Sequence, residues 1–330
     1  MKIVRRVFIA AIVLLIASVV FTLSAQAQTL KKIRIGSTTP GITTLPIEIA
    51  AQRGFFKDEG LQPEMITIRS SDIIIQALLS GQLDFSTALA TLATAAAKRL
   101  PIKIVAVISK KPSFVMVSHP SIHEISNLKG KVVGIASFGG AADYAVRVAL
   151  QKNGLDPKRD LTILQVGGSG ARFAALQAGT IQATVLVAPF NLVAQKKGFR
   201  SLLWLGSVMD LPEGGLGASV NKLRDSPEDV VSTMKAIDRG IQFIRANRDE
   251  TVKFMMKWLN LDRSIAEGTY KIVTESLADF GITDDKVIEN ALEAVRFQGH
   301  VDQDVSLSQL RDWSFAKKAQ AEILQPTSPR

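Results

Sequence analysis

The fold is decided by the stretch "ALLSGQLDFSTALA", residues 77–90, in which a glycine separates a helical pattern from a short apolar run. We predict that a helix ends at Gly81, because glycine readily adopts the left-handed conformation that closes helices. A short strand at 83–88 and an alanine-rich helix at 91–99 are predicted to follow. Three polar residues ahead of the first helix can cap it: Ser70, Ser71 and Asp72.

Asp84, inside this stretch, is either a working carboxylate or a residue that only sets a turn. The chain repeats the pattern as "ALQAGTIQATVL", residues 175–186, where Gly179 stands 98 positions after Gly81. In the second copy Gln182 occupies the place of Asp84, so the same turn is built without a charge. We therefore predict a structural role for Asp84.

Strands and helices alternate on both sides of this repeat. The strand-to-loop sections Ile35-Gly36-Ser37 and Ile135-Ala136-Ser137 lie 100 positions apart, and the order of predicted elements agrees between the halves. This alternation favours an α/β fold of two similar lobes, each with a largely parallel sheet. From Ser226 onward the pattern is mostly helical, with Ser226 as the predicted cap and Pro227 in the first turn.

Residues 1–27 have the pattern of a secretory signal peptide. Three basic residues are followed by an apolar run at 7–20, and small residues precede a cleavage point after Ala27. A membrane anchor is the alternative, but the run is short for a span of about 20 residues. No other stretch could span a bilayer. We expect export, most simply to a Gram-negative periplasm.

Charge and composition exclude several classes of function. Residues 1–27 hold three of the 40 cations and none of the 30 acids, so the remainder carries 37 against 30, a net charge of +7. The cations form scattered pairs such as Lys110–Lys111, which argues against a nucleic-acid partner and leaves a weak attraction for anionic solutes. The absence of cysteine excludes disulfides, thiolate metal sites, cysteine nucleophiles and a lipid-modified cysteine.

Motifs of catalysis and cofactor binding are missing from the sequence. The stretch "GGSGA" at 167–171 has neither the G-x-G-x-x-G spacing nor the lysine of a P-loop. His119 and His123 are four residues apart, but Pro120 disfavours a helix at His119, and no H-E-x-x-H occurs. No serine elbow or triad order is visible. We therefore predict no cofactor, no metal and no catalytic residue.

Several segments resemble a known family. They are "AAQRGFFKDEGLQPE" at 50–64, "NLKGKVVGIASFGG" at 127–140, "NGLDPKRDLTILQV" at 153–166 and "SPEDVVSTMKAI" at 226–237, together with the two glycine-turn copies. In this order, over roughly residues 32–300, the chain resembles the periplasmic solute-binding proteins of ABC importers. The resemblance is to their nitrate/sulfonate/taurine group, which also includes binders of thiamine-precursor pyrimidines and riboflavin. The chain departs from that family at Gln182, where an acidic residue is usual.

The resemblance implies a type II periplasmic binding-protein fold, in which two α/β lobes are joined by a two-strand hinge. Lobe 1 would comprise residues 28–115 and 216–330, and lobe 2 would comprise residues 116–215. Hinge strands would lie near 114–120 and 206–220. The solute would bind in the cleft between the lobes, and hinge closure would present it to a membrane permease.

Candidate binding loops can be chosen without the family. Ligands of open α/β sheets bind beyond the carboxyl ends of strands, at helix N-termini. Hydroxyls and free backbone N–H groups there suit a carboxylate, sulfonate, phosphate or polar heterocycle, although such residues also make ordinary caps and turns. The first half offers Ser37, Thr38, Thr39, Gly41, Ser70, Ser71, Asp72, Ala88 and Leu89. The second half offers Ser137, Phe138, Gly139, Gly140, Ser169, Pro189 and Phe190.

Some candidate side chains leave two interpretations open. Phe138, Tyr144 and Phe190 can stack on an aromatic ligand or belong to the core. Arg172, just inside the helix after "GGSG", can pair with an anion or lie on the surface. The carboxylate of Asp72 can form an ion pair with an amine of the ligand or cap its helix.

We expect a monomeric receptor that binds a small anionic or heterocyclic solute and delivers it to an ABC permease at the inner membrane. A periplasmic sensor module that presents its ligand to a non-transport partner is one alternative. An enzyme resembling the thiamine-pyrimidine synthases is another, but those relatives rely on a cysteine-rich motif, and this chain has no cysteine.

Overall fold

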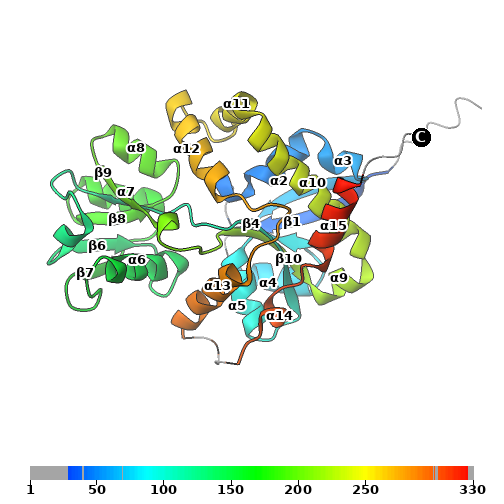
Figure 1. Cartoon of the computed structure of the whole chain (residues 1–330), viewed down its shortest axis with the longest axis horizontal. Helices are drawn as coiled ribbons and strands as arrows, with labels where there is room; N and C mark the ends of the chain where they lie inside the picture. Colours follow the sequence, from blue (N-terminus) through cyan, green and yellow to red (C-terminus); the bar gives the residue numbers. More distant parts are fainter. Residues whose placement is uncertain (1–28, 39–40, 69, 300, 302–303, 326–330) are drawn as a thin grey trace, which may run out of the picture. The chain divides into compact units, whose positions relative to one another are not determined.

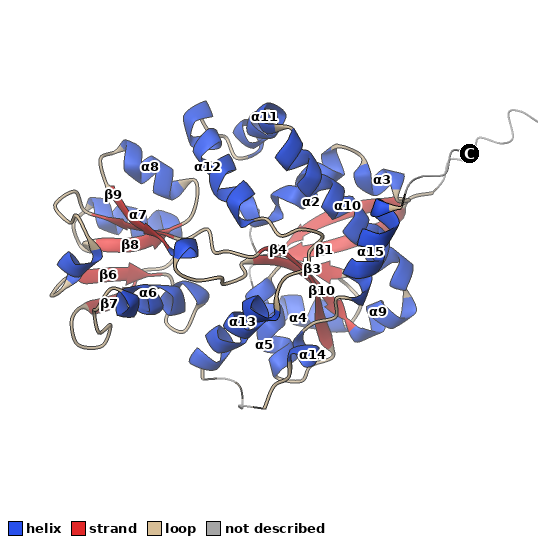
Figure 2. Cartoon of the chain, viewed as in Figure 1, coloured by secondary structure: helices blue, strands red, loops and turns tan. Residues whose placement is uncertain are grey.

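The computed structural model describes residues 29–38, 41–68, 70–299, 301 and 304–325, which form two five-stranded sheets with helices around them (Figures 1 and 2). The predicted signal peptide lies outside the described residues. Within the described part of the chain, no helix is both long enough and apolar enough to cross a bilayer.

The first sheet has one strand that runs against its neighbours. Its strands are β1 (Lys31–Ser37), β2 (Leu61–Thr67), β3 (Phe85–Ser86), β4 (Ile102–Ser109) and β10 (Gly214–Ser219). Their order is β2-β1-β3-β10-β4. β1 and β3 are parallel, whereas β10 is antiparallel to both β3 and β4. The predicted strand at 83–88 is thus only two residues long.

The second sheet repeats this plan. Its strands are β5 (Val115–Ser118), β6 (Val132–Ile135), β7 (Thr162–Gln165), β8 (Ala183–Leu186) and β9 (Arg200–Trp204). The order is β7-β6-β8-β5-β9, with β6 parallel to β7 and β8, and β5 antiparallel to β8 and β9. The sheets are thus largely parallel in strand direction, as expected, except that β5 and β10 run against their neighbours. The chain crosses between the sheets twice, and each crossing delivers one reversed strand.

The two segments in which the chain passes from one sheet to the other are hydrogen-bonded to each other. The carboxylate of Glu213, just before β10, accepts a hydrogen bond from the backbone N–H of Ser113, just before β5, at 2.7 Å. Burial raises the pKa of Glu213 above its usual value. The two segments that connect the sheets are therefore bonded together, as expected of a two-strand hinge.

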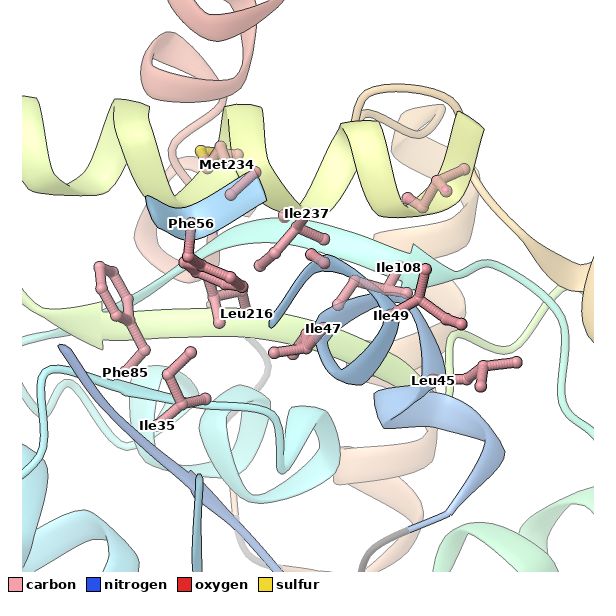
Figure 3. Packing of buried hydrophobic residues seen from close by; sticks show 14 of the residues in the cluster. Ile35, Leu45, Ile47, Ile49, Phe56, Phe85, Ile108, Leu216, Met234 and Ile237 are labelled. Carbon is pink, nitrogen blue, oxygen red and sulfur yellow. The ribbon is translucent and has the colours of Figure 1, made fainter. Parts of the chain in front are cut away.

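Helices cover both faces of the first sheet. One face packs on α2 (Leu45–Gln52), α3 (Phe55–Asp58), α9 (Val220–Asp225), α10 (Pro227–Ala246), α11 (Arg248–Trp258), α12 (Arg263–Ser276) and α15 (Ser314–Leu324). The other face packs on α4 (Ser71–Leu79), α5 (Leu89–Ala97), α13 (Asp285–Phe297) and α14 (Leu307–Leu310). Figure 3 shows Ile35, Phe85 and Leu216 of three adjacent strands facing Ile47 of α2 and Ile237 of α10.

The second sheet lies between α6 (Ala141–Lys152) on one face and α7 (Ser169–Gln177) with α8 (Phe190–Lys196) on the other. Three short 3-10 turns complete the described elements: η1 (Ile42–Thr44), η2 (Ile125–Leu128) and η3 (Leu205–Ser207). Ser226 occupies the predicted N-cap position of α10, but its side chain makes no capping hydrogen bond.

Asp84 has the structural role that the sequence predicts. Its carboxylate accepts a hydrogen bond from the backbone N–H of Arg34 at 2.9 Å and pairs with Lys222 Nζ at 3.0 Å. In the second sheet, Gln182 Oε1 accepts a hydrogen bond from the backbone N–H of Val132 at 3.1 Å. An acid and an amide therefore bind the neighbouring strand at equivalent positions.

The strand register corrects one internal alignment. The residues that lie opposite each other are Gly36 with Ser86 and Gly134 with Thr184. Equivalent strand positions thus differ by 98 residues (134 − 36 and 184 − 86), and the offset of 100 expected for the strand-to-loop sections is wrong. A Cβ on Gly36 would meet Leu83 at 2.5 Å, and a Cβ on Gly134 would meet Ile181 at 2.5 Å. At both positions a side chain larger than that of glycine would collide with the neighbouring leucine or isoleucine.

The Asp84→Ala variant is expected to lower the free energy of unfolding by about 1.5 kcal/mol. It removes a charge-assisted hydrogen bond and leaves the largely buried Lys222 to its second partner, Asp229. The matched Gln182→Ala variant removes two neutral hydrogen bonds, one from the N–H of Val132 and one to the carbonyl of Gly179, and no ion pair, so we expect a smaller loss. Urea unfolding of both proteins measures the difference, and equal losses would contradict a stabilising role for the ion pair.

Candidate functional site

A pocket of about 740 Å³ lies between helices of the first sheet and the start of α6, and we call it the cleft pocket. Its lining residues are Asp72, Ile75, Gln76 and Leu79 of α4; Ala90, Thr91, Thr94, Ala95 and Lys98 of α5 and its end; and Leu100, Gly140, Ala141 and Gln298. The volume is in the range of small-molecule sites in proteins. Helices that cover the first sheet and the start of α6, which covers the second sheet, therefore line one cavity.

The wall from α4 follows from helical spacing. Ser70 caps this helix, because its Oγ accepts a hydrogen bond from the N–H of Ile73. Asp72 is therefore not the cap; its exposed side chain lies in the first turn and lines the cleft pocket. Lining residues at i, i+3, i+4 and i+7 from Asp72 form one face of the helix. That face mixes a carboxylate and an amide with apolar side chains, which suits a solute with polar and apolar parts.

The loop before α6 is organised by Asp143, which is buried. One of its carboxylate oxygens accepts a hydrogen bond from the N–H of Gly139 at 2.9 Å, and the other pairs with Arg147 Nε at 2.7 Å. The N–H of Phe138 donates to Gln165 Oε1 at 3.1 Å. These bonds hold the loop so that Gly140 lines the cleft pocket while the ring of Phe138 stays 57% exposed.

Arg172 is buried, with 4% of its surface exposed, so its interpretation as a surface residue is wrong. Nε donates to the carbonyl oxygen of Val185 at 2.9 Å, and the remaining nitrogens donate to the carbonyl of Gly167 and to Ser169 Oγ. No ion pair joins Arg172 to a carboxylate in the part of the chain that the structure describes. Burial lowers the pKa of this guanidinium, which marks an uncompensated positive charge.

A second buried polar group lies near this arginine. Asn191, in the first turn of α8, is 2% exposed, and its Oδ1 has no hydrogen-bond partner among the described residues. Phe190 precedes it and is 37% exposed, and its ring stands 3.8 Å from the position of a Cβ on Gly170. The starts of α7 and α8 thus meet at Gly170 and Phe190, which neighbour Arg172 and Asn191 in the sequence.

The predicted site residues divide into several places. Asp72 and Gly140 line the cleft pocket, Ser169 binds Arg172, and Phe190 lies beside Gly170. Ser137, Phe138 and Gly139 form the loop before α6. Residues that do not line the cleft pocket also include Ser37, Thr38, Gly41, Ser70, Ala88 and Pro189. Ser71 begins α4, and Thr39 lies outside the described residues.

Two predicted site residues have other surroundings. Leu89 is 2% exposed and belongs to the core beneath the first sheet. Tyr144 faces α13, where its hydroxyl donates to Glu293 at 3.2 Å and its ring lies 5.5 Å from that of Phe297. Burial and the neighbouring Glu293 raise the pKa of Tyr144 to about 12.

Sequence reasoning missed four polar residues of the cleft pocket. Gln76 and Thr94 lie along α4 and α5, and Lys98 lies at the end of α5, whereas the rule that ligands bind at helix N-termini selected only the starts of these helices. The four-residue spacing from Asp72 to Gln76 could have indicated that both lie on one helix face. Gln298 lies at the end of α13, and no local pattern connects it with Gly140. Among the described residues, no group of three histidine, aspartate or glutamate side chains could hold a metal ion.

Comparison with known proteins gives one family and two curated relatives. A family described as NMT1/THI5 like matches residues 42–251. The protein YtlA of Bacillus subtilis is 24% identical over 303 residues, which cover 89% of this chain and 85% of that protein. The riboflavin-binding protein RibY of Chloroflexus aurantiacus is 24% identical over 292 residues, which cover 83% and 82%.

Solved structures share the fold. The periplasmic aliphatic sulphonate binding protein SsuA of Escherichia coli has a TM-score of 0.72 at 17% identity, and the match covers 86% of this chain and 97% of that chain. The desulfurization enzyme DszB has a TM-score of 0.66 at 13% identity and covers 89% and 99%. The predicted type II periplasmic binding-protein fold is therefore confirmed, and it is a fold that carries both binding proteins and an enzyme.

Proposed function

The chain belongs to the NMT1/THI5-like family, and from this premise we propose that it is an extracytoplasmic receptor for a small solute. The solute is captured in the cleft between the two lobes and delivered to the permease of an ABC importer at the inner membrane. Lobe 1 comprises residues 28–115 and 216–330, and lobe 2 comprises residues 116–215. The receptor acts as a monomer after cleavage behind Ala27.

The observation that carries this proposal is the cleft pocket, about 740 Å³ in volume and lined by helices of both sheets. A solute held there touches both lobes, so its binding favours the closed arrangement of the hinge. The relatives include a binder of riboflavin and a fold neighbour that binds aliphatic sulphonates. Riboflavin and aliphatic sulphonates are both small solutes with anionic or heterocyclic groups.

The buried guanidinium of Arg172 favours a solute that carries a negative group, whether a simple anion or a heterocycle. A buried cation without a carboxylate partner is costly, and an anion from solution would compensate it. The N-terminus of α7, where Ser169 stands, adds N–H groups of the same polarity. Asp72 and Lys98 line the cleft pocket and offer both signs of charge to a solute held there.

Binding rather than catalysis fits the chemistry of this site. The chain has no cysteine, and two groups near the loops whose pKa values are shifted, Arg172 and Tyr144, are held by hydrogen bonds to the carbonyl of Val185 and to Glu293. The shared fold of DszB keeps an enzyme as the competing function. Turnover of a bound solute, detected by mass spectrometry, would favour that alternative over the receptor.

A thermal-shift screen of the purified protein tests the proposal. The panel contains alkanesulfonates, nitrate, pyrimidines, riboflavin and aromatic carboxylates. A solute at a hundredfold excess over its Kd stabilises the folded state by about 2.7 kcal/mol, which is readily seen as a rise in Tm. No shift with any class, together with no solute found bound in native mass spectrometry, would contradict the receptor function.

The Arg172→Gln variant is expected to weaken binding of the solute found in that screen by about tenfold to hundredfold, because a charge-assisted hydrogen bond is lost. Arg200→Gln is the control, since Arg200 is exposed on β9 and its Nε binds only the carbonyl of Pro120. Ser137→Ala keeps every buried hydrogen bond and should weaken binding moderately. Calorimetry measures all three, and unchanged affinity in both Arg172→Gln and Ser137→Ala would refute the loop assignment.

A further inference from the structure

A second pocket, of about 680 Å³, lies along α6 and shares no lining residue with the cleft pocket. Its walls are the helix α6, the turn that follows it and the end of α13. Tyr144, Arg147, Asp156, Lys158 and Phe297 are among its lining residues. We call it the α6–α13 pocket. It is nearly as large as the cleft pocket, yet the proposed solute receptor does not use it.

One wall of the α6–α13 pocket is aromatic. The ring of Phe297 is 42% exposed, although a side chain of this size is usually covered. It lies 5.5 Å from the ring of Tyr144, at an angle of 56° between the ring planes, and the guanidinium carbon of Arg147 stands 5.8 Å from its centroid. An aromatic ligand can therefore pack against Phe297 and Arg147 together.

The charge that this pocket offers to a ligand is positive. Its acid, Asp156, already accepts hydrogen bonds from the N–H of Lys158 at 2.8 Å and from Arg159 Nε at 2.5 Å, and these bonds lower the pKa of Asp156. Arg147 uses Nε on Asp143 and has further N–H groups. The ammonium of Lys158 forms no ion pair with the described residues.

From this geometry we propose that the α6–α13 pocket is a second ligand site, for a flat aromatic carboxylate. The ring lies on Phe297 and beside Arg147, and the carboxylate pairs with Lys158. The occupant contacts α6, which covers the second sheet, and α13, whose Ile288 and Leu292 are buried beneath the first sheet. Binding there is therefore coupled to the arrangement of the two lobes, and so to the affinity of the cleft.

Calorimetry with naphthalene-2-carboxylate tests the site in the full chain. Phe297→Ala removes the exposed ring, and Lys158→Glu reverses the pairing charge; both side chains lie at the surface of the pocket, so the fold should persist. We expect each variant to weaken binding by at least about tenfold. Lys253→Glu, on the exposed face of α11, is the matched charge control and should bind as the wild type does.

Three further arms define the ligand class and the location. The neutral alcohol naphthalene-2-methanol and the saturated acid cyclohexanecarboxylate should each bind at least about tenfold more weakly than the aromatic acid. Arg172→Gln should leave naphthalene-2-carboxylate binding unchanged, because it alters only the loops of α7 and α8. No binding by the wild type at millimolar probe, or equal affinity in Phe297→Ala or Lys158→Glu, would overturn the proposal. So would loss of binding in Arg172→Gln alone, which would place the probe in the cleft and leave the receptor function standing.

Discussion

Gly240→Ala is expected to lower the free energy of unfolding by about 3 kcal/mol, even though alanine favours a helix over glycine by about 1 kcal/mol. Gly240 is buried in α10 where that helix crosses α2. A Cβ there would press against the carbonyl oxygen of Pro46 and lie 3.2 Å from the Cβ of Ala50. A backbone oxygen cannot move aside as the end of a flexible side chain can, so the two helices must separate.

Gly170→Ala is the matched control for this prediction. Gly170 also lies in a helix, but its nearest neighbour would be the ring of Phe190 at 3.8 Å, an ordinary contact distance. We expect its stability to stay constant or to rise by up to about 1 kcal/mol. Urea unfolding with a common slope compares the two variants. Equal free-energy changes would show that the α2–α10 contact has room for a methyl group.

Asp238 is expected to make the protein less stable as the pH rises from about 4 to about 7. The residue lies in α10, is 4% exposed, and neither carboxylate oxygen has a hydrogen-bond partner within normal distance among the described residues. Burial raises its pKa to about 6. The side chain of Gln242, the backbone N–H of Phe280 and the charge of Arg245 face the carboxylate and offset only part of that effect, while Asp279 adds to it. A cavity of about 10 Å³ beside Asp238 leaves room for at most one water molecule.

The sign of this dependence follows from proton binding. Between the unfolded pKa of about 3.9 and the folded pKa of about 6, the folded state holds a proton that the unfolded state has lost. Raising the pH therefore removes stability, by about 3 kcal/mol in total, and most of the loss is complete slightly above the folded pKa.

The Asp238→Asn variant isolates this effect, because other carboxylates titrate equally in both proteins. The difference in free energy of unfolding, variant minus wild type, should increase by about 2 kcal/mol between pH 4 and pH 7. Asp249→Asn removes an exposed carboxylate from α11 and reports the effect of losing a surface charge. A difference that stays flat with pH for Asp238→Asn would show that this carboxyl is ionised throughout.

Most helices and strands could be predicted because their signals are local. The helix stop at Gly81, with φ of 74°, and its copy at Gly179, with φ of 73°, are conformations that glycine adopts freely. The structural role of Asp84 followed from comparing it with Gln182 in the second copy. The reversed strand β10 could not be predicted, since its direction depends on a chain that has first built the second sheet.

The candidate site was predicted only in outline. The rule that ligands bind where strands end selected Asp72, Gly140 and the loops near Arg172. It also selected Leu89 and Ser37, which are buried. Position in a loop does not decide which way a side chain points, because that direction depends on packing against other elements.

The sequence by itself determined the alternation of strands and helices, the doubled α/β plan and the glycine turns, because hydrophobic period and backbone freedom act over a few residues. Only the tertiary structure decided that Arg172 is a buried cation without an acid partner, and that Gln298 lies beside Gly140. It also decided that Phe297 lies over the face of α6. These contacts join residues distant in the chain, and they exist only where whole helices and sheets pack, which no short stretch of sequence encodes.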